Sequence, residues 1–338
     1  MTVNCPSALD RRTVLGALAS VPLALGLAAA ARAQDAYPSR PVKIVVPVPP
    51  GPPADIVSRV IASSLAAQYG QSFVIENKVG AGGFVAMQQI STQTRPDGYT
   101  LLSGGLGTQV LPPVIFQNLP LDPMKTFAPV AFLGDMYNVF IVRADSPIQS
   151  MDDLLRLVKD KPGAVTIGSQ PAGSSPHMGY ALLAQQTDTT WNFVPYKGPN
   201  EVLSDVLSGV VDVGTSQLPG YAAIIKSGRV RALAVSAPAR AAIFPDVPTV
   251  AEAGVPGYAV SSWLGFFTLA STPQPIVDGL SKSIATALAD PGVRSQLLAT
   301  GFAPGHLNPQ EFAKRIEQDF ALWSGVAKRA GIRMTYGQ

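Results

Sequence analysis

Residues 41–56 are Pro41-Val42-Lys43-Ile44-Val45-Val46-Pro47-Val48-Pro49-Pro50-Gly51-Pro52-Pro53-Ala54-Asp55-Ile56, and this stretch decides the fold class. Its first half is a short run of Val and Ile, which is typical of a buried strand in a parallel sheet. The Pro/Gly loop that follows would not be tolerated inside a strand or a helix. Beyond the loop the apolar spacing becomes helical, with one face formed by Ile56, Val57, Val60, Ile61, Ser64 and Leu65.

The stretch therefore predicts a strand, a tight loop and a helix whose N-terminus lies at the carboxyl end of the strand. In open α/β sheets ligands bind at that end, because unpaired N–H groups and the helix dipole favour an anion there. An ordinary strand-to-helix connection without a ligand is equally compatible with residues 41–56 alone.

The same alternation continues along the chain and predicts an α/β fold. Strand-like runs separated by helical patterns occur at 73–75, 99–102, 139–142, 165–168, 192–194, 210–214, 231–235 and 264–269. The run at 165–168 enters a second loop of small residues, in which Ser175 is expected to cap a helix with Pro176 at its first position. Two helices are expected to close the chain, with core-facing stripes at Ile276, Leu280, Ile284 and Leu288, and at Phe312, Ile316, Phe320 and Trp323.

The first 33 residues have the features of an export signal. Arg11-Arg12 precede an apolar run from Val14 to Ala31, and Ala31-Arg32-Ala33 is a typical A-x-A cleavage site. We therefore expect cleavage after Ala33 and a periplasmic mature protein that begins at Gln34. The paired arginines suggest the twin-arginine route, although general-secretion signals also carry two arginines. An uncleaved anchor is a weaker interpretation, because the run is short for a membrane span and ends in a cleavage site.

Composition narrows the function classes. Removing residues 1–33 removes three arginines and one aspartate, so the net charge of the remaining 305 residues falls from +3 to +1. Lys and Arg are scattered rather than clustered, so no nucleic-acid partner is expected. The only cysteine, Cys5, lies in the expected signal, which leaves the mature chain without disulfides, thiolate nucleophiles or cysteine metal sites. A chain of this length suits two lobes better than one small core.

Candidate catalytic residues are few. The two histidines are His177 and His306, and no His, Asp or Glu residues have metal-ligand spacing, so neither a metal nor a cofactor is expected. Residues 80–85 only half match a dinucleotide fingerprint, because Val85 stands where the third glycine would be. An exported hydrolase is an alternative that would pair His177 with a serine of the 169–175 loop. No nucleophile-elbow motif or orienting acid accompanies them.

Six motifs follow one another along the mature chain. They are Tyr37-Pro38-Ser39-Arg40-Pro41-Val42, Pro49-Pro50-Gly51 with Asp55, Glu76-Asn77-Lys78-Val79-Gly80-Ala81-Gly82-Gly83, Pro96-Asp97-Gly98-Tyr99-Thr100-Leu101-Leu102, Val194-Pro195-Tyr196-Lys197-Gly198 and Phe244-Pro245-Asp246-Val247-Pro248-Thr249-Val250-Ala251-Glu252-Ala253-Gly254. This series resembles the Bug (TctC-like) family, the periplasmic solute receptors of tripartite tricarboxylate transporters.

The resemblance implies a type II-like periplasmic-binding-protein fold. Two lobes, each a mainly parallel sheet flanked by helices, would enclose a ligand cleft. The resemblance also implies capture of a small carboxylated compound, such as a di- or tricarboxylate or an aromatic acid, without catalysis. Membrane permease subunits of the transporter would then be the partners, and we expect the receptor to be a monomer.

We expect residues 37–137 with 236–338 to form one lobe and residues 138–235 the other, joined by two crossings that allow hinge closure. No Lys/Arg cluster lies at the loop ends, so an anionic ligand would be held by backbone N–H groups, hydroxyls and the positive ends of two helices. The expected ligand-binding residues are Gly51, Asp55, Ser103, Gly104 and Thr108 on one side, and Ala172, Gly173, Ser174, Ser175, His177, Tyr196 and Gln217 on the other.

Two segments depart from the family pattern. Pro52 and Pro53 stand where the family usually has glycines, and proline has no N–H group. Capture by this loop must therefore use Gly51, Ala54, Asp55 or an ordered water. Gln217 stands where the family commonly has an acidic residue, which favours an acid that lacks an amino group.

A periplasmic sensing module that binds the same ligand is the remaining alternative function.

Overall fold

The computed structural model describes residues 1–2 and 37–337 of the 338-residue chain. Apart from Met1 and Thr2, the expected export signal with its cleavage site lies outside the described residues. The chain divides into Met1–Ser39 and Arg40–Gln338, and every helix and strand below belongs to the second unit. Within residues 37–337, no helix combines the length and apolar character that a membrane span requires.

The first lobe is built on a mixed sheet rather than a mainly parallel one. β2 (Phe73–Asn77), β1 (Val42–Val46) and β3 (Thr100–Gly105) are parallel. β10 (Ser261–Leu269) pairs antiparallel with β3 and with the first part of β5 (Phe127–Arg143), which also pairs with β11 (Ala303–Leu307). The helices are α2 (Pro53–Tyr69), α3 (Phe84–Gln93), α4 (Leu106–Gln109), α5 (Leu111–Ile115), α6 (Pro123–Thr126), α11 (Gln274–Ala289), α12 (Pro291–Ala299) and α13 (Pro309–Ala330), with the 3-10 turn η1 (Ala81–Gly83) before α3.

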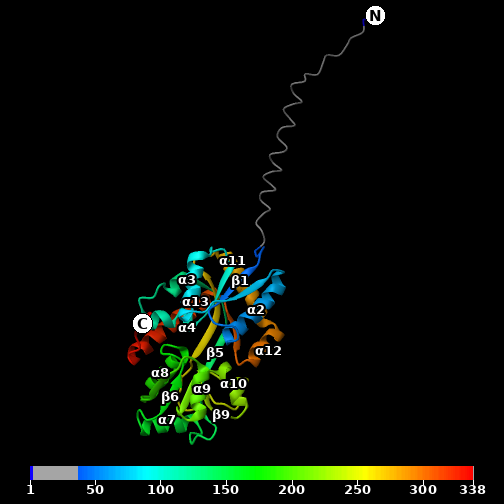
Figure 1. The fold of residues 1–338 in the computed structure, drawn as a ribbon. Coiled ribbons are helices and arrows are strands. Elements are labelled where there is room, and N and C mark those ends of the chain that lie inside the picture. Colours follow the sequence, from blue (N-terminus) through cyan, green and yellow to red (C-terminus); the bar gives the residue numbers. More distant parts are fainter. Residues whose placement is uncertain (3–36, 338) are drawn as a thin grey trace. The chain divides into compact units, whose positions relative to one another are not determined.

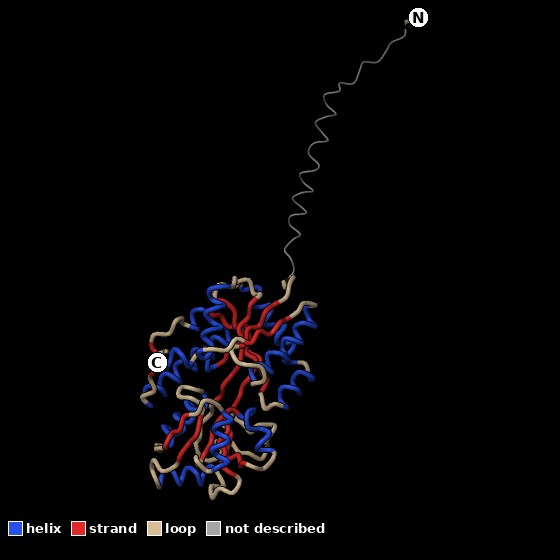
Figure 2. Tube along the Cα trace, in the orientation of Figure 1, coloured by secondary structure: helices blue, strands red, loops and turns tan. Residues whose placement is uncertain are grey.

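The second lobe uses the remaining part of β5, which pairs antiparallel with β8 (Val213–Gln217) and β9 (Val230–Val235). β8 is parallel to β6 (Thr166–Ser169), and β6 is parallel to β7 (Asn192–Pro195). The helices are α7 (Met151–Asp160), α8 (Ser175–Thr187), α9 (Pro199–Ser208) and α10 (Leu218–Lys226). Figures 1 and 2 show the two groups of helices around their strands, with β5 extending through both. The predicted two-lobed α/β fold class is confirmed.

Strand direction makes the two sheets face each other. β5 pairs with β10 over residues 127–137 and with β8 and β9 over residues 138–143, so it runs from the first lobe into the second. β10 is antiparallel to both β3 and β5, so β1, β2 and β3 also run toward the second lobe. β8 is antiparallel to β5, so β6, β7 and β8 run toward the first lobe. The carboxyl ends of both parallel groups therefore meet between the lobes, where α/β proteins bind ligands.

The helix predicted after the opening loop is confirmed as α2, but its predicted core face is partly wrong. Val57 and Leu65 are fully buried, whereas the side chain of Ile56 is 36% exposed. Ser58 takes part in the buried face instead. Its hydroxyl donates to the Ala54 carbonyl at 2.6 Å, so burial of this polar group leaves no unpaired donor.

Two further expectations need correction. The strand predicted at 210–214 begins only at Val213, because the N–H groups of Val210 and Val211 close the end of α9 by bonding to the Asp205 carbonyl. The described part of the chain closes with three helices rather than two. α12 is the additional one, and Asp290 caps it by accepting a hydrogen bond from the Val293 N–H at 2.9 Å.

The lobes also contact each other through α8 and α13. Leu183 of α8 and Trp323 of α13 belong to one hydrophobic cluster that extends across both lobes. Gln185 ties the two helices: its Nε2 donates to the Val326 carbonyl at 3.0 Å, and its Oε1 accepts from Nε of Arg329 at 2.9 Å. The connection between lobes is therefore a packed helix pair as well as the crossing strands.

Parallel β4 (Phe116–Gln117) and β12 (Met334–Thr335) form a separate two-stranded sheet, which joins the end of α5 to the C-terminal segment.

Candidate ligand site

Asp55 organises the loop between β1 and α2. It is buried, and its Oδ1 accepts from Nδ2 of Asn77 at 2.8 Å and lies 2.9 Å from Nη2 of Arg59. Its Oδ2 accepts from the Gly51 N–H and from Nε of Arg59, both at 3.0 Å. Burial alone would raise the pKa of this carboxyl, but the hydrogen bonds from Arg59, Asn77 and Gly51 outweigh it and hold the pKa below its usual value. Both oxygens are thus occupied in holding the loop.

The loop leaves few backbone donors for an anion. The Gly51 N–H is already bonded to Asp55, and the N–H groups of Asp55 and Ile56 bond to the Pro52 carbonyl at 2.9 and 3.1 Å. Pro52 and Pro53 have no N–H group. Among the described residues, no acceptor is found for the Ala54 N–H, which lies in the first turn of α2. Gly51, Ala54 and Asp55 were the groups expected to capture a ligand in this loop. Of their three N–H groups, that of Ala54 is the one without an acceptor among the described residues.

Ser103, Gly104 and Thr108 lie at the carboxyl end of β3, as the sequence predicts. Their polar groups bond within the lobe. The Oγ atoms of Ser103 and Ser58 lie 2.9 Å apart, and Thr108 Oγ1 accepts from the Gly105 N–H at 2.9 Å. These residues therefore form the floor behind the opening loop.

His177 holds the 169–175 loop of the second lobe. Its Nδ1 accepts from the Gly173 N–H at 3.0 Å, and its own N–H donates to Ser174 Oγ at 3.4 Å. Ser174 rather than Ser175 is therefore the cap of α8. Ser174 has the extended backbone that a cap requires (φ −69°, ψ 159°), whereas Ser175 already belongs to the helix. Ala172 is exposed at the tip of this loop.

The His177 ring is buried, with its centroid 4.3 Å from that of Phe193 and 6.1 Å from that of Tyr180. Burial lowers the pKa of His177 to about 4, so the imidazole is neutral at neutral pH. Because Nδ1 accepts a hydrogen bond, the ring proton belongs on Nε2. The ring also lines a cavity of about 340 Å³ together with Tyr180 and Gln185. No hydrogen bond joins the ring to a serine hydroxyl in the described chain.

Beneath this loop lies a group of buried polar side chains with no hydrogen-bond partner among the described residues: Asn138, Ser169, Ser175 and Thr215. Ser169 and Thr215 are paired on β6 and β8, so they point to the same face of the sheet. Phe140 of β5 also pairs with Thr215, and Asn138 lies two residues before it on the same face.

α8 covers this face at Ser175. A Cβ on Gly179 would lie 3.1 Å from Nδ2 of Asn138, and Ser175 is one turn earlier on the same side of the helix. We call Asn138, Ser169, Ser175 and Thr215 the buried polar cluster. A buried polar group without a partner costs about 1–3 kcal/mol, so four in one place indicate a site for a polar partner.

The sequence identified only Ser175 of this cluster. Ser169 and Thr215 carry a usable signal, because Ser169 ends β6 and Thr215 lies two residues before the end of β8, and both carboxyl ends face the other lobe. Asn138 carries a weaker one, as a single amide before the apolar run Val139-Phe140-Ile141-Val142.

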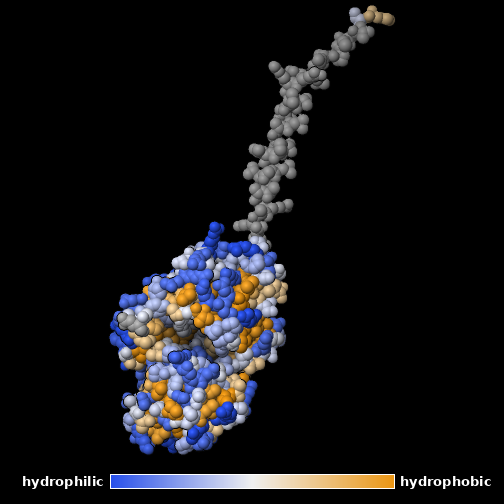
Figure 3. Space-filling view, viewed as in Figure 1, coloured by the Kyte–Doolittle hydropathy of each residue, from blue (hydrophilic) through white to orange (hydrophobic). Residues whose placement is uncertain are grey.

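Gln217 lies beside the loop, whereas the Tyr196 hydroxyl does not face it. Gln170 Nε2 donates to Ser216 Oγ at 2.8 Å and to Gln217 Oε1 at 3.2 Å, so these polar groups meet at the ends of β6 and β8. The Tyr196 hydroxyl donates to Asp205 of α9 at 2.6 Å. Desolvation and that carboxylate raise the pKa of Tyr196 to about 12. Figure 3 shows the surface hollowed between the two lobes.

A family model described as "Tripartite tricarboxylate transporter family receptor" matches residues 57–332, which is well over half of the chain. The chain belongs to this receptor family. It is 31% identical over 315 residues to Protein BugT of Bordetella pertussis, and the match covers 91% of this chain and 94% of that relative. The family predicted from the six motifs is confirmed.

Solved structures of similar proteins support the receptor fold. "R. palustris Rpa4515 with adipate" has a TM-score of 0.79 and 33% identity, covering 88% of this chain and 99% of that one. "MatC (Rpa3494) from Rhodopseudomonas palustris with bound malate" has a TM-score of 0.71 and 31% identity, covering 86% and 99%. The tripartite tricarboxylate transporter receptor fold therefore extends over the described lobes.

Proposed function

We propose that this receptor captures a small carboxylated compound in the periplasm and delivers it to the membrane permease subunits of a tripartite tricarboxylate transporter. The observation that carries the proposal is the buried polar cluster, which lies near the carboxyl ends of β6 and β8 that face the first lobe. Structures of two similar proteins contain adipate and malate, and both of those ligands are dicarboxylates.

Capture would rely on backbone and hydroxyl groups, because few cations are available at these loops. The Ala54 N–H and the positive end of α2 would meet one end of the ligand, while Gly51 and Asp55 keep the loop in shape. Ser103, Gly104 and Thr108 would support this side from behind. On the other side the ligand, directly or through an ordered water, would satisfy Ser175 and the groups below it, within a loop shaped by Ala172, Gly173, Ser174 and His177.

The far end of the site would favour an acid without an amino group. Gln217 and Gln170 are neutral and bond to each other, so no fixed carboxylate is available there to pair with an ammonium. A dicarboxylate or an aromatic acid suits such surroundings better than an amino acid. Tyr196 would contribute by its position behind the β6–α8 loop rather than through its hydroxyl, which is bonded to Asp205.

Ligand capture would change the relation between two lobes, which we assign to residues 37–137 with 236–338 and to residues 138–235. The chain passes between them within β5 and again after β9. Two passages allow hinge motion around a ligand. We further propose that the receptor is a monomer and that the signal is cleaved after Ala33, by either export route.

The role would be binding without catalysis. His177, which a hydrolase would need as a base, is buried and has its Nδ1 bonded to the Gly173 N–H. A sensing role with the same ligand is the second candidate, since the geometry of capture is the same for both. Binding of the loaded receptor to the purified permease would favour transport, and binding to a sensor instead would favour signalling.

Native mass spectrometry of the purified receptor tests the central proposal. A co-purified acid of defined mass, released on denaturation, is the expected result. Calorimetric titration with that acid should then give one site per chain, with affinity lowered in Ser175→Ala. Failure of adipate, malate and a panel of aromatic acids to bind a folded, solute-free receptor would contradict carboxylate capture.

A further inference from the structure

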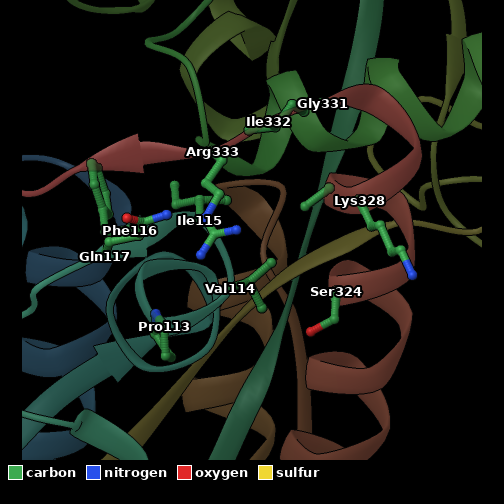
Figure 4. Close-up of a pocket in the computed structure, with 11 residues that line it drawn as sticks. Pro113, Val114, Ile115, Phe116, Gln117, Ser324, Lys328, Gly331, Ile332 and Arg333 are labelled. Carbon is green, nitrogen blue, oxygen red and sulfur yellow. The ribbon is translucent and has the colours of Figure 1, made fainter.

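A second cavity, of about 520 Å³, lies between α5, β4 and the C-terminal end of α13. Figure 4 shows its lining residues. The walls are largely apolar and include Val114, Ile115, Ala327 and Ile332. Its polar groups are Gln117, Ser324, Lys328 and Arg333, and no Asp or Glu lines it. The cavity thus combines an apolar wall with positive charge.

The C-terminal segment puts Arg333 over this cavity. α13 ends at Ala330, and Gly331 takes the left-handed conformation (φ 64°) that turns the chain back. β12 then pairs with β4, with Met334 opposite Phe116, so Arg333 lies immediately before the paired residues. Figure 4 shows its side chain extending from this segment toward Val114.

The Arg333 guanidinium has unused hydrogen-bonding capacity. Gln117, with its amide oxygen oriented toward the guanidinium, accepts from Nη2 at 2.7 Å and also from Nε. Two of the five guanidinium N–H groups are then used, which leaves three for another acceptor. The ion pairs found among the described residues include neither Arg333 nor Lys328.

We propose that this cavity is a second binding site, for a small organic monocarboxylate with an apolar body. The carboxylate would pair with Arg333 and accept from the Ser324 hydroxyl, while the body packs against Val114, Ile115 and Ile332. The cavity volume lies within the usual range of small-molecule sites, which is about 300–1,000 Å³. Lys328 lies at the exposed rim, where it attracts anions without being enclosed.

The second site touches the 169–175 loop through one residue. A side chain at Gly173 would clash with Cδ1 of Ile115, so Ile115 packs directly on that loop. Occupancy of the cavity would therefore contact the side chain that supports the loop. The two sites are nevertheless separate, because Arg333, Ser324 and Val114 belong to no part of the capture site proposed between the lobes.

Methyl NMR with benzoate as the probe tests the second site. Titration should shift the methyl signals of Val114 and Ile332, with a single saturable affinity. Arg333→Gln should weaken this affinity about tenfold, as expected for loss of one charge-assisted pair, and Lys328→Gln about two- to threefold. Lys159→Gln, which removes an exposed lysine from α7 of the other lobe, should bind like the wild type. Benzyl alcohol, which keeps the ring without the charge, should bind more weakly than benzoate.

Either of two results would overturn the second site. In one, the Val114 and Ile332 methyls do not shift at saturating benzoate in the folded wild type. In the other, both Arg333→Gln and Lys328→Gln titrate like the wild type. Benzoate binding between the lobes would shift other methyls and would not depend on Arg333, so loss of this proposal leaves the capture site intact.

Discussion

The N–H of Gly173 donates to Nδ1 of His177 across 3.0 Å, four residues along the chain. The loop and the first turn of α8 are thereby fastened by one neutral imidazole. Gly173 has a left-handed backbone (φ +82°), which glycine tolerates best, so the loop depends on both residues. The tether gives a structural role to the histidine in the first turn of α8, for which the sequence offered a ligand-binding or catalytic role.

The first prediction is that His177 makes the receptor sensitive to acid. Its pKa is lowered by burial from 6.5 to about 4. As pH falls, the unfolded chain takes up this proton first, so stability is complete above pH 6.5 and declines as pH falls through about 4. Over the whole interval from pH 6.5 to about pH 4, the loss in the free energy of unfolding is about 3 kcal/mol. In urea unfolding between pH 8 and pH 4.5, His177→Gln should lose less stability than the wild type; equal losses would contradict the tether.

The second prediction concerns Gly173 and Ile115. Gly173→Ala should destabilise the receptor by about 1–3 kcal/mol, because the new Cβ meets the Ile115 side chain and the backbone is left-handed. Ile115→Val shortens the opposing side chain and should recover part of this loss in the double variant. Urea unfolding of the four proteins measures the coupling. Strict additivity would show that the two residues do not press on each other.

The third prediction concerns Asp55. Asp55→Asn keeps the shape of the side chain but replaces one carboxylate oxygen with an NH₂ group. That donor would face other donors, because Gly51, Arg59 and Asn77 all donate to this side chain. We expect a loss of about 1–3 kcal/mol in stability, together with weaker ligand binding because the loop loses its anchor. Asp145→Asn is the matched control, since Asp145 pairs with Arg143 at the exposed surface and should change stability by less than about 0.5 kcal/mol. Similar losses in both variants would argue against a special role for Asp55.

The fourth prediction separates two neighbouring serines. Ser174 caps α8, so Ser174→Ala should lower stability by about 1 kcal/mol and affect binding only weakly. Ser175 has a buried hydroxyl without a protein partner, so Ser175→Ala should leave the free receptor as stable or more stable. Its ligand affinity should nevertheless fall about five- to tenfold, if the ligand satisfies that hydroxyl. Thermal unfolding and calorimetry of both variants measure this, and the reverse pattern would exchange the two roles.

Much of the fold could be predicted from the sequence because each element carried its own local signal. The Val/Ile run at 42–46 followed by a Pro/Gly loop predicts β1 and the start of α2. Residues 308–311 have the sequence pattern of a capping box, and the side chains of Asn308 and Glu311 form that box at the start of α13. The face of α2 was harder to predict, because Ser58 becomes a core residue only once its hydroxyl bonds to Ala54 within the helix.

The candidate site was less predictable, because its chemistry depends on which polar groups are already paired. Gly51 and Gly173 were expected to offer their N–H groups to a ligand, yet each bonds to a side chain four residues later, Asp55 and His177. Neither pairing follows from residue type alone. Conversely, Asn138 and Thr215 become candidates only through the register of β5, β6 and β8, which leaves them without partners beneath α8.

The last prediction is that Gln185 limits how far the lobes separate. Gln185 of α8 is bonded to the Val326 carbonyl and to Arg329 of α13, so it joins a helix of each lobe. Gln185→Ala removes both bonds and should allow wider separation in the free receptor. The expected result is a larger radius of gyration by X-ray scattering without ligand, and an unchanged radius with saturating ligand.

Gln68→Ala is the matched control for this experiment. Gln68 also donates to a backbone carbonyl of a neighbouring helix, that of Ser283 at 3.1 Å, but both helices belong to the first lobe. Its loss should therefore leave the scattering of the free receptor unchanged. Since wider separation must be reversed on capture, Gln185→Ala should also bind its ligand more weakly while Gln68→Ala does not. Identical scattering of the wild type and Gln185→Ala would mean that the packed core around Leu183 and Trp323, rather than Gln185, holds the two helices together.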